Sequence, residues 1–276
     1  MIKIITDSTA DLGEDLVNEF KVKVIPLSVF IGGKTYRDGL DLDPGNLFAM
    51  VEKYGELPKT AAPSVLDFQA VFKGAESLYV GISSKLSATL QNAHLAKDEI
   101  PGTNVRIVDS LNLSTGIGLL VLKAAELRDA GCSLDEIEQA LLSSRSKVRT
   151  SFVVETMDYL YKGGRCTALQ ALMGSMLKIR PIIDVRQDGT IGVKAKARGT
   201  RQKALEMMLA DFEGDLSSVD LHRIFVTHTG CDQDAAFLAG EITRMSSADE
   251  IRITLAGSVI SSHCGPGTIG ILYFVK

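Results

Sequence analysis

The run IKIITDSTADLGEDLVNEFKVKVIPLSVFIGG, residues 2–33, decides the fold class of this chain. Its first apolar stretch, residues 2–5, predicts a strand. Residues 12–20 have the apolar spacing of a helix, and residues 22–31 predict a second strand that ends at Gly32 and Gly33. A strand, a helix and another strand in succession are typical of α/β proteins, so this run predicts an α/β fold.

The same alternation continues along the rest of the chain. Ser64 with Asp67, and Ser133 with Glu136, have the spacing of helix capping boxes. Asp188 and Gly189 predict a hairpin turn within residues 181–198. Further strands are expected at residues 78–82, 104–108, 151–154, 224–227 and from 251 onward. Helices are expected at residues 64–73, 115–130, 133–149, 167–179, 200–212 and 234–245, with a short one that ends at residues 162–165.

Length and composition indicate a globular protein with two domains. The chain has 276 residues, of which 45% are hydrophobic, and a single hydrophobic core seldom exceeds about 250 residues. We therefore expect one α/β domain at residues 1–150 and a second at residues 151–276.

Charge and aromatic content make nucleic acid an unlikely class of partner. The chain has 30 Lys and Arg residues and 34 Asp and Glu residues, which gives a formal net charge of −4, and the basic residues form no stripe. Aromatic residues make up 6% of the chain and Trp is absent, which argues against a surface on which bases stack.

The sequence predicts a cytoplasmic location and no membrane insertion. The apolar start is too short for a signal peptide before Asp7 interrupts it. The longest run without charged residues, 253–275, is broken in its middle by polar residues and by Gly265, Pro266 and Gly267, so it is not expected to cross a bilayer. The cysteines have no CxxC spacing, which argues against zinc and favours a reducing compartment. They are Cys132, Cys166, Cys231 and Cys264.

Hydroxyl-rich segments follow several of the predicted strands. They are residues 6–9, 83–87 and 108–110, and a loop at residues 58–64 adds Thr60 between two prolines. Ligands bind at the carboxyl ends of strands in open α/β sheets, and hydroxyls with free N–H groups at helix starts attract anions. The alternative at each position is ordinary capping of the next helix, and Asp7 is expected to be a turn or cap residue.

The terminal run 261–270 matches GxGxxG at residues 265–270, but a strand-like run, 269–275, follows it instead of a helix. A dinucleotide-binding fingerprint needs that helix, so the sequence predicts a glycine-rich loop that carries His263. A tight hairpin loop with a surface histidine is the alternative.

Catalytic patterns are weak. No GxSxG elbow surrounds Ser83 or Ser87, although either serine, or Cys264, can be imagined as a nucleophile with His263 as its base. Asp7 lacks the second carboxylate of phosphoaspartate enzymes, because Thr9 stands two residues later. The remaining histidines lack ligand spacing and are expected to be structural. They are His94, His222 and His228.

Taken together, five segments in chain order resemble the DegV family. They are residues 6–12 (TDSTADL), 59–64 (KTAAPS), 81–89 (GISSKLSAT), 162–165 (KGGR) and the terminal glycine-rich run. DegV proteins are bacterial two-domain α/β proteins that hold a long-chain fatty acid, and characterised members are the fatty-acid-binding subunit of fatty acid kinase. The resemblance implies a ligand cleft between or beside the two domains, and a separate protein that binds ATP.

The resemblance also implies roles for particular residues. Thr60 and Ser87 correspond to the hydroxyls that hold the fatty-acid carboxylate. Arg165 and His263 would lie in the head-group and phosphotransfer region, and Arg198 resembles a basic position for docking the kinase. The family commonly has Ser where this chain has Ala61, which removes a possible donor near the head group.

The expected function is therefore to bind a long-chain fatty acid and to present its carboxylate to a separate ATP-dependent kinase for acyl phosphate formation. The chain itself would be a non-catalytic subunit with no cofactor and no metal, and it contains no P-loop for ATP. Leu172, Met173 and Met176 are candidates for lining the tail cavity, with ordinary core packing as the alternative. Two alternatives stay open: a small-acid hydrolase or phosphotransferase that uses the same cleft, and a lipid carrier without a kinase partner.

Overall fold

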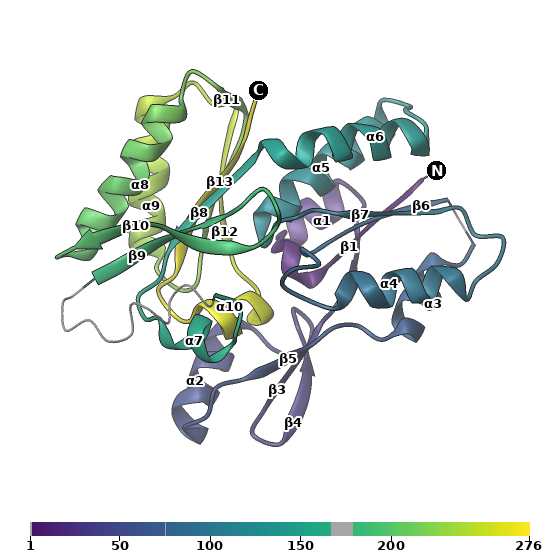
Figure 1. Ribbon diagram of the computed structural model, residues 1–276, viewed down its shortest axis with the longest axis horizontal. Coiled ribbons are helices and arrows are strands. Elements are labelled where there is room, and N and C mark those ends of the chain that lie inside the picture. Colours follow the sequence, from purple (N-terminus) through teal and green to yellow (C-terminus); the bar gives the residue numbers. More distant parts are fainter. Residues whose placement is uncertain (1, 75, 167–178) are drawn as a thin grey trace.

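The computed structural model describes residues 2–74, 76–166 and 179–276, and it has the predicted α/β fold (Figure 1). Its strands form three sheets, with four, three and six strands in the described residues. The expected helix at residues 167–179 lies outside the described residues, except that Ile179 begins a strand.

The four-stranded sheet is parallel and has the order β2-β1-β6-β7. Its members are β1 (Lys3–Asp7), β2 (Lys23–Ile25), β6 (Ser77–Gly81) and β7 (Val105–Asp109). Every residue of β6 is buried, as expected for a strand with helices on both faces of its sheet. Because the strands run in parallel, their carboxyl ends, and the loops that follow them, lie at one edge.

The strand predicted at residues 22–31 is wrong in one respect, because the structure divides it between two sheets. β2 ends at Ile25, and β3 (Ser28–Ile31) belongs to an antiparallel three-stranded sheet in which it lies between β4 (Lys34–Arg37) and β5 (Lys59–Ala61). Pro26 stands at the break, and proline has no N–H to continue a strand ladder. Ser8 accepts a hydrogen bond from the Leu27 N–H, which ties the crossing segment to the end of β1.

The six-stranded sheet is mixed and has the order β10-β9-β8-β13-β11-β12. Its members are β8 (Val148–Val153), β9 (Ile179–Val185), β10 (Ile191–Arg198), β11 (Val219–His228), β12 (Glu250–Leu255) and β13 (Ile269–Val275). The predicted hairpin is confirmed, since β9 and β10 pair antiparallel around Gly189, whose φ is +83°.

Within the described residues, helices are found at the predicted places, with some changes at their ends, and also at residues 44–54, 89–98 and 258–264, where none was predicted. They are α1 (Glu14–Glu19), α2 (Pro44–Tyr54), α3 (Val65–Phe72), α4 (Thr89–Asp98), α5 (Thr115–Asp129), α6 (Leu134–Ser144), α7 (Asp158–Lys162), α8 (Arg201–Asp215), α9 (Asp232–Met245) and α10 (Ser258–Cys264). Both capping boxes are confirmed, at α3 and at α6. The helix predicted at residues 133–149 ends early, at Ser144, because the chain joins the six-stranded sheet from Val148. The helix predicted at residues 12–20 also begins later, at Glu14.

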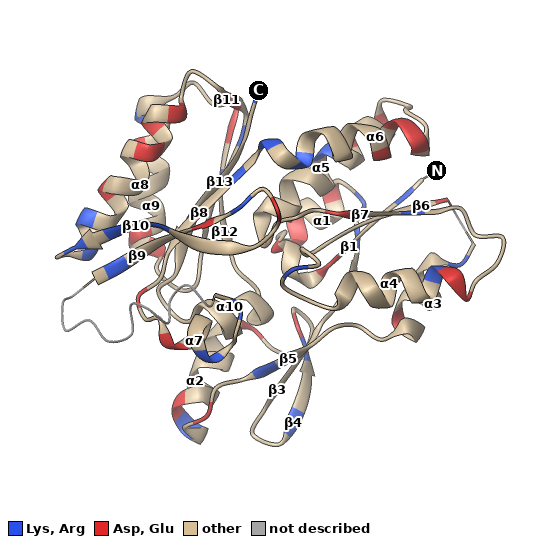
Figure 2. Cartoon of the chain, in the orientation of Figure 1, with Lys and Arg blue, Asp and Glu red and all other residues tan. Residues whose placement is uncertain are grey.

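Helices cover both faces of the six-stranded sheet. Figure 1 shows α8 and α9 on one side of this sheet and α5 on the other, where α5 also packs against β1 of the parallel sheet. α5 is buried along most of its length, as expected for a helix between two sheets, whereas α8 carries blue and red residues on its outer surface in Figure 2. The largest hydrophobic cluster therefore joins residues of both halves of the chain, among them Val80, Leu120, Phe152 and Leu272.

In the part of the chain that the structure describes, no helix is long and apolar enough to cross a membrane. The division at residues 1–150 and 151–276 stays a prediction.

Candidate functional site

Two predicted site residues that lie 203 positions apart meet in the structure. The Oγ1 of Thr60 lies 2.8 Å from the Nε2 of His263. Thr60 lies in the middle of β5, in the three-stranded sheet, and not in the loop expected from its neighbouring prolines. The contact therefore joins a strand of the first half to α10 of the second half.

The predicted loop around His263 is wrong, because residues 258–264 form the helix α10. His263 lies in its last turn, and Gly265, with φ of +79°, ends it. The alternative of a hairpin with a surface histidine is also excluded, since most of the imidazole is buried. The glycines Gly265 and Gly267 therefore end α10 and form the turn that follows it.

One cavity contains all four residues expected near a carboxylate head group. We call it the Thr60 cavity; its empty volume is about 500 Å³, part of which is open to solvent. Its lining residues are Leu27, Thr60, Ile82, Leu86, Ser87, Leu113, Phe152, Leu160, Arg165, Ile191, Val259, Ile260, His263 and Cys264. Polar groups thus converge in a largely apolar cavity, which is the usual composition of a site for a small organic ligand.

Ser87 reaches this cavity from the segment that follows β6. Its Oγ lies 2.7 Å from the Oγ1 of Thr89, and the Thr89 N–H donates to it at the start of α4. Ser87 therefore supports the start of α4 and also lines the cavity, and its contact with a carboxylate stays a prediction.

Arg165 brings a positive charge to the cavity from the end of the Lys-Gly-Gly-Arg segment. Its Nη1 donates to the carbonyl of Gly163 at 2.6 Å and its Nε to the carbonyl of Leu86 at 3.4 Å. Among the described residues no carboxylate forms an ion pair with it, so its charge is free to meet an anionic ligand.

His263 is held in its neutral form. Burial, with a smaller effect from the nearby Arg165 guanidinium, lowers the pKa of His263 to about 4. Its Nδ1 is buried and has no hydrogen-bond partner among the described residues. A Cβ added at Gly163 would lie 2.7 Å from this Nδ1, so a residue without a side chain is needed where α7 ends against the imidazole.

The depressed pKa of His263 predicts a pH dependence of stability. Its ordinary value is 6.5, so the unfolded chain takes up the proton first as the pH falls. The contribution of neutral His263 is fully present above about pH 6.5 and is lost as the pH falls toward 4, by at most about 3 kcal/mol. Urea unfolding measures the free energy of unfolding of the wild type and of His263→Gln. As the pH falls over this range, the value for the wild type should decrease relative to that for the variant. A difference that stays constant from pH 7 to pH 4 would contradict the buried neutral state.

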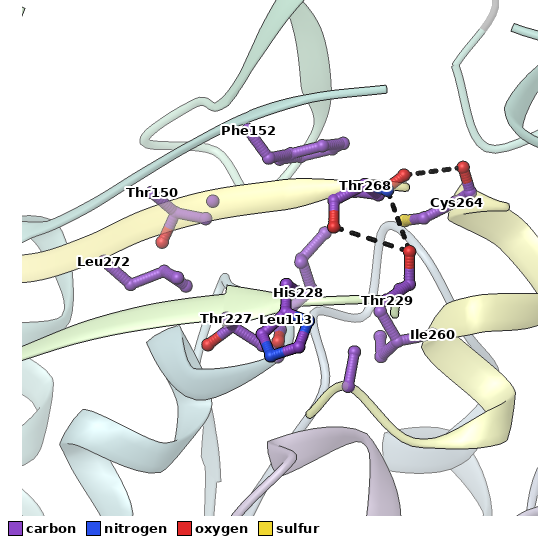
Figure 3. A pocket seen from close by; sticks show the side chains of 13 residues that line it. Leu113, Thr150, Phe152, Thr227, His228, Thr229, Ile260, Cys264, Thr268 and Leu272 are labelled. Carbon is purple, nitrogen blue, oxygen red and sulfur yellow. Dashed lines mark hydrogen bonds between the residues drawn. The ribbon is translucent and has the colours of Figure 1, made fainter. Parts of the chain in front are cut away.

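A second cavity adjoins the first. We call it the Thr150 cavity; its empty volume is about 320 Å³, and it shares Leu113, Phe152, Ile260 and Cys264 with the Thr60 cavity. Figure 3 shows that these side chains lie among the ends of β8, β11 and β13. The two cavities together place apolar walls behind the polar group of Thr60, Ser87, Arg165 and His263.

The hydroxyls around the Thr150 cavity are bonded to protein groups. Thr229 Oγ1 donates to the Gly265 carbonyl at 2.7 Å. Thr268 Oγ1 donates to the Cys264 carbonyl at 2.8 Å (Figure 3). Thr150 Oγ1 donates to the Asn112 Oδ1 at 2.8 Å. Because these hydroxyls are already satisfied, the cavity suits an apolar ligand better than a polar one.

Sequence reasoning missed the shared wall of the two cavities. Leu113 follows a predicted strand and Phe152 lies within one, which marks them only as core residues. Cys264 was considered only as a nucleophile, but it is buried, and burial raises the pKa of its thiol to about 12. A thiol with that pKa is not a nucleophile at neutral pH.

The other predicted positions lie elsewhere. Arg198 is exposed at the end of β10 and is not among the residues that line the two cavities. Leu172, Met173 and Met176 fall outside the described residues. The His228 Nδ1 accepts a hydrogen bond from the Cys231 N–H, and His222 lies beside Glu126. The described residues contain no group of three His, Cys, Asp or Glu that could hold a metal ion.

Asp7 is the cap residue that the sequence predicts. Its carboxylate accepts from the Thr9 N–H at 3.1 Å, from the Tyr79 hydroxyl at 2.6 Å and from the Ile82 N–H at 3.2 Å. These bonds join the ends of β1 and β6 beneath the loops that follow them. Asp7 therefore supports the loop that carries Ser87 and does not line the Thr60 cavity.

Comparison with known proteins identifies the family. A family model described as "Uncharacterised protein, DegV family" matches residues 1–276. The chain belongs to the DegV family. A DegV domain-containing protein of Clostridium acetobutylicum is 34% identical over 284 residues, which cover 100% of this chain and 98% of that protein.

Solved DegV structures have the same fold. A fatty-acid-binding DegV protein from Thermus thermophilus superimposes with a TM-score of 0.93 at 34% identity, over 100% of this chain and 99% of the other. The Fatty Acid Kinase (Fak) B3 protein of Streptococcus pneumoniae, loaded with linoleic acid, superimposes with a TM-score of 0.88 at 26% identity and covers 100% of both chains. These DegV proteins of known structure bind fatty acids, which confirms the family and the fold expected from the five sequence segments.

Proposed function

We propose that this chain binds a long-chain fatty acid and presents its carboxylate to a separate ATP-dependent kinase. The observation that carries the proposal is the convergence of Thr60, Ser87, Arg165 and His263 in one cavity whose remaining walls are apolar. The linoleic acid held by the Streptococcus pneumoniae protein supports the same ligand class.

The polar groups of the Thr60 cavity match the needs of a buried carboxylate. A carboxylate removed from water requires donors and a nearby cation. Two hydroxyls can supply the donors, and the Arg165 guanidinium, which forms no ion pair with a carboxylate of the described residues, can supply the cation. The tail would lie along the shared wall toward the Thr150 cavity. About fourteen methylenes at about 0.8 kcal/mol each would contribute roughly 11 kcal/mol before the cost of association.

The same contacts argue against a hydrolase in this cleft. Ser83 donates to the Gly189 carbonyl, and Ser87 is bonded to Thr89, so neither serine is paired with a histidine of the described residues. Thr60 does meet His263, but no described residue forms a hydrogen bond with the other ring nitrogen, Nδ1. A nucleophile and base without that third group lack the arrangement that activates a hydroxyl.

Extraction of the purified protein tests the ligand class. We expect denaturing mass spectrometry to find one long-chain fatty acid per chain, and delipidation to lower the melting temperature, because a ligand bound only to the folded state stabilises it. A clean extract, together with no melting shift on adding palmitate or oleate, would refute the proposal.

The carboxylate contacts predict the effect of removing each hydroxyl. Thr60→Ala and Ser87→Ala should each weaken palmitate binding by about 1 to 3 kcal/mol, because hydrogen bonds to a charged acceptor are stronger than neutral ones. Calorimetric titration of delipidated protein measures the change. Ser143→Ala, which removes an exposed hydroxyl of α6, is the matched control and should bind normally. Normal affinity in the Thr60 and Ser87 double variant would place the carboxylate elsewhere.

A further inference from the structure

The helix that carries His263 is capped by carboxylates from distant parts of the chain. The cap residue of α10, Gly257, has no side chain to bond the first N–H groups, and the first turn contains no acidic residue. The Gly257 N–H donates to Asp11 Oδ1 at 2.8 Å, and the Ser258 N–H donates to Asp38 Oδ1 at 2.6 Å. The Ser8 hydroxyl and the Val259 N–H also lie close enough to Asp38 to lower its pKa. The N–H groups left free at a helix start are thus satisfied from the first half of the chain.

Both aspartates are themselves fixed in place. Asp11 ends the short 3-10 turn after β1 with a left-handed φ of +50°, and its Oδ2 accepts from the Ser114 hydroxyl at 2.5 Å. Asp38 follows β4, and its second oxygen, Oδ2, is buried without a hydrogen-bond partner among the described residues. Only 6% of Asp11 and 2% of Asp38 is exposed.

This arrangement is costly for the folded state. No cation of the described residues is among the main influences on the pKa of either aspartate, and the charge of Asp38 raises the pKa of Asp11. Burial, as the main cause, raises the pKa of Asp38 to about 6 and that of Asp11 well above its usual value. If stability alone mattered, a neutral cap such as Ser or Thr at Gly257 would be favoured. The use of two buried carboxylates instead points to a need to fix the position of α10.

α10 connects these carboxylates to the Thr60 cavity. Val259 and Ile260 line that cavity from the start of the helix, and His263 and Cys264 line it from the end. α10 is short and packs against α2, α7, β3 and β5. A displacement of its first turn therefore moves the imidazole relative to Thr60.

We propose that Asp11 and Asp38 are positioning residues for the carboxylate site, which hold α10 by its first N–H groups so that His263 meets Thr60. Neither residue lines the Thr60 cavity, so they act through the helix and not by contact with a ligand. The effect on fatty-acid affinity rests on the proposed function, whereas the effect on His263 does not.

Asp38→Asn is the sharpest test, because it keeps the shape of the side chain and removes the charge that meets the Ser258 N–H. We expect the affinity for palmitate to fall about tenfold, the size expected for loss of a charge-assisted hydrogen bond. Asp41→Asn is the matched control: Asp41 lies three residues later, is exposed and pairs with Arg37, and its removal should leave affinity unchanged.

The imidazole ¹⁵N resonances of His263 report its position in ligand-free protein, and the His263→Ala spectrum assigns them. In Asp38→Asn they should move toward their values in Thr60→Ala, because the Thr60 contact is weakened in both. If Asp38→Asn lowers stability without displacing α10, the His263 resonances should keep their wild-type values. In a double-mutant cycle, Asp38→Asn should cost little further affinity once His263→Ala is present.

Unchanged palmitate affinity and unchanged His263 resonances in Asp38→Asn would overturn the proposal, as would a full additional loss of affinity in the His263→Ala background. If Asp38→Asn does not fold, Asp11→Asn is judged by the same two measurements. If the wild type binds no palmitate, the proposed function fails, and the His263 resonances alone decide whether the aspartates position α10.

Discussion

Arg165→Ala and His263→Ala should still copurify with fatty acid, with palmitate affinity lowered by no more than about tenfold, but should lose acyl phosphate formation by about 10²- to 10³-fold in the presence of a cognate kinase and ATP. Arg165 is the cation in the Thr60 cavity that no carboxylate of the described residues neutralises, so it can meet the charge that develops on a transferred phosphoryl group. Neutral His263 beside Thr60 can orient the attacking carboxylate. Apolar burial of the tail, which supplies most of the affinity, is unchanged in both variants.

Turnover and bound lipid are measured on the same preparations, by phosphate transfer from ATP and by mass spectrometry of the extract. Arg244→Ala, which removes an exposed arginine of α9 that pairs with Glu241, is the matched control and should keep full turnover. ATP consumption by the protein without a kinase would contradict the role of a presenting subunit. Loss of lipid in both variants would assign the two residues to binding instead.

Cys264→Leu is expected to reduce palmitate affinity at least a hundredfold while affecting octanoate little. Cys264 lies on the wall shared by the two cavities, so a tail that reached from one cavity into the other would have to pass the larger leucine side chain. Exclusion of about four to six methylenes from the Thr150 cavity, at about 0.8 kcal/mol each, accounts for the loss. A short acid would keep its carboxylate contacts in the Thr60 cavity.

The control for this variant is Cys132→Leu, which makes the same change at a half-buried cysteine that lines neither cavity. Calorimetric titration with both acids gives the two affinities, and thermal melting measures the cost of overpacking, about 1 to 3 kcal/mol in a well-packed interior. Equal losses for palmitate and octanoate would show that the tail does not use the Thr150 cavity.

Local patterns predicted the fold class because they depend on neighbouring residues. The capping boxes at Ser64 and Ser133 satisfy helix N–H groups within three residues, and the turn at Gly189 needs only one residue with a positive φ. Two of the errors occurred where a distant partner decided the outcome. The helix predicted at residues 133–149 ends early because the chain pairs with β13 from Val148. The strand predicted at residues 22–31 is divided at Pro26 because its two parts pair in different sheets.

The candidate site could be predicted in part. The resemblance of five segments singled out Thr60, Ser87, Arg165 and His263, which the fold brings into one cavity. The wall of Leu113, Phe152, Ile260 and Cys264 was not predicted, because each residue has the pattern of ordinary core. Whether an apolar side chain fills the core or lines a cavity depends on what lies opposite, and a single sequence does not contain that information.

By itself, the sequence determined that the chain alternates strands and helices, begins α3 and α6 at capping boxes, and carries the hydroxyls and the arginine that we propose for an anion site. The tertiary structure decided that residues 258–264 form a helix, that Asp11 and Asp38 cap it, and that His263 is neutral beside Thr60. Periodicity and capping are properties of neighbouring residues. Burial and pairing between residues more than 200 positions apart arise only when the whole chain packs, and they shift the pKa of His263 and orient its ring.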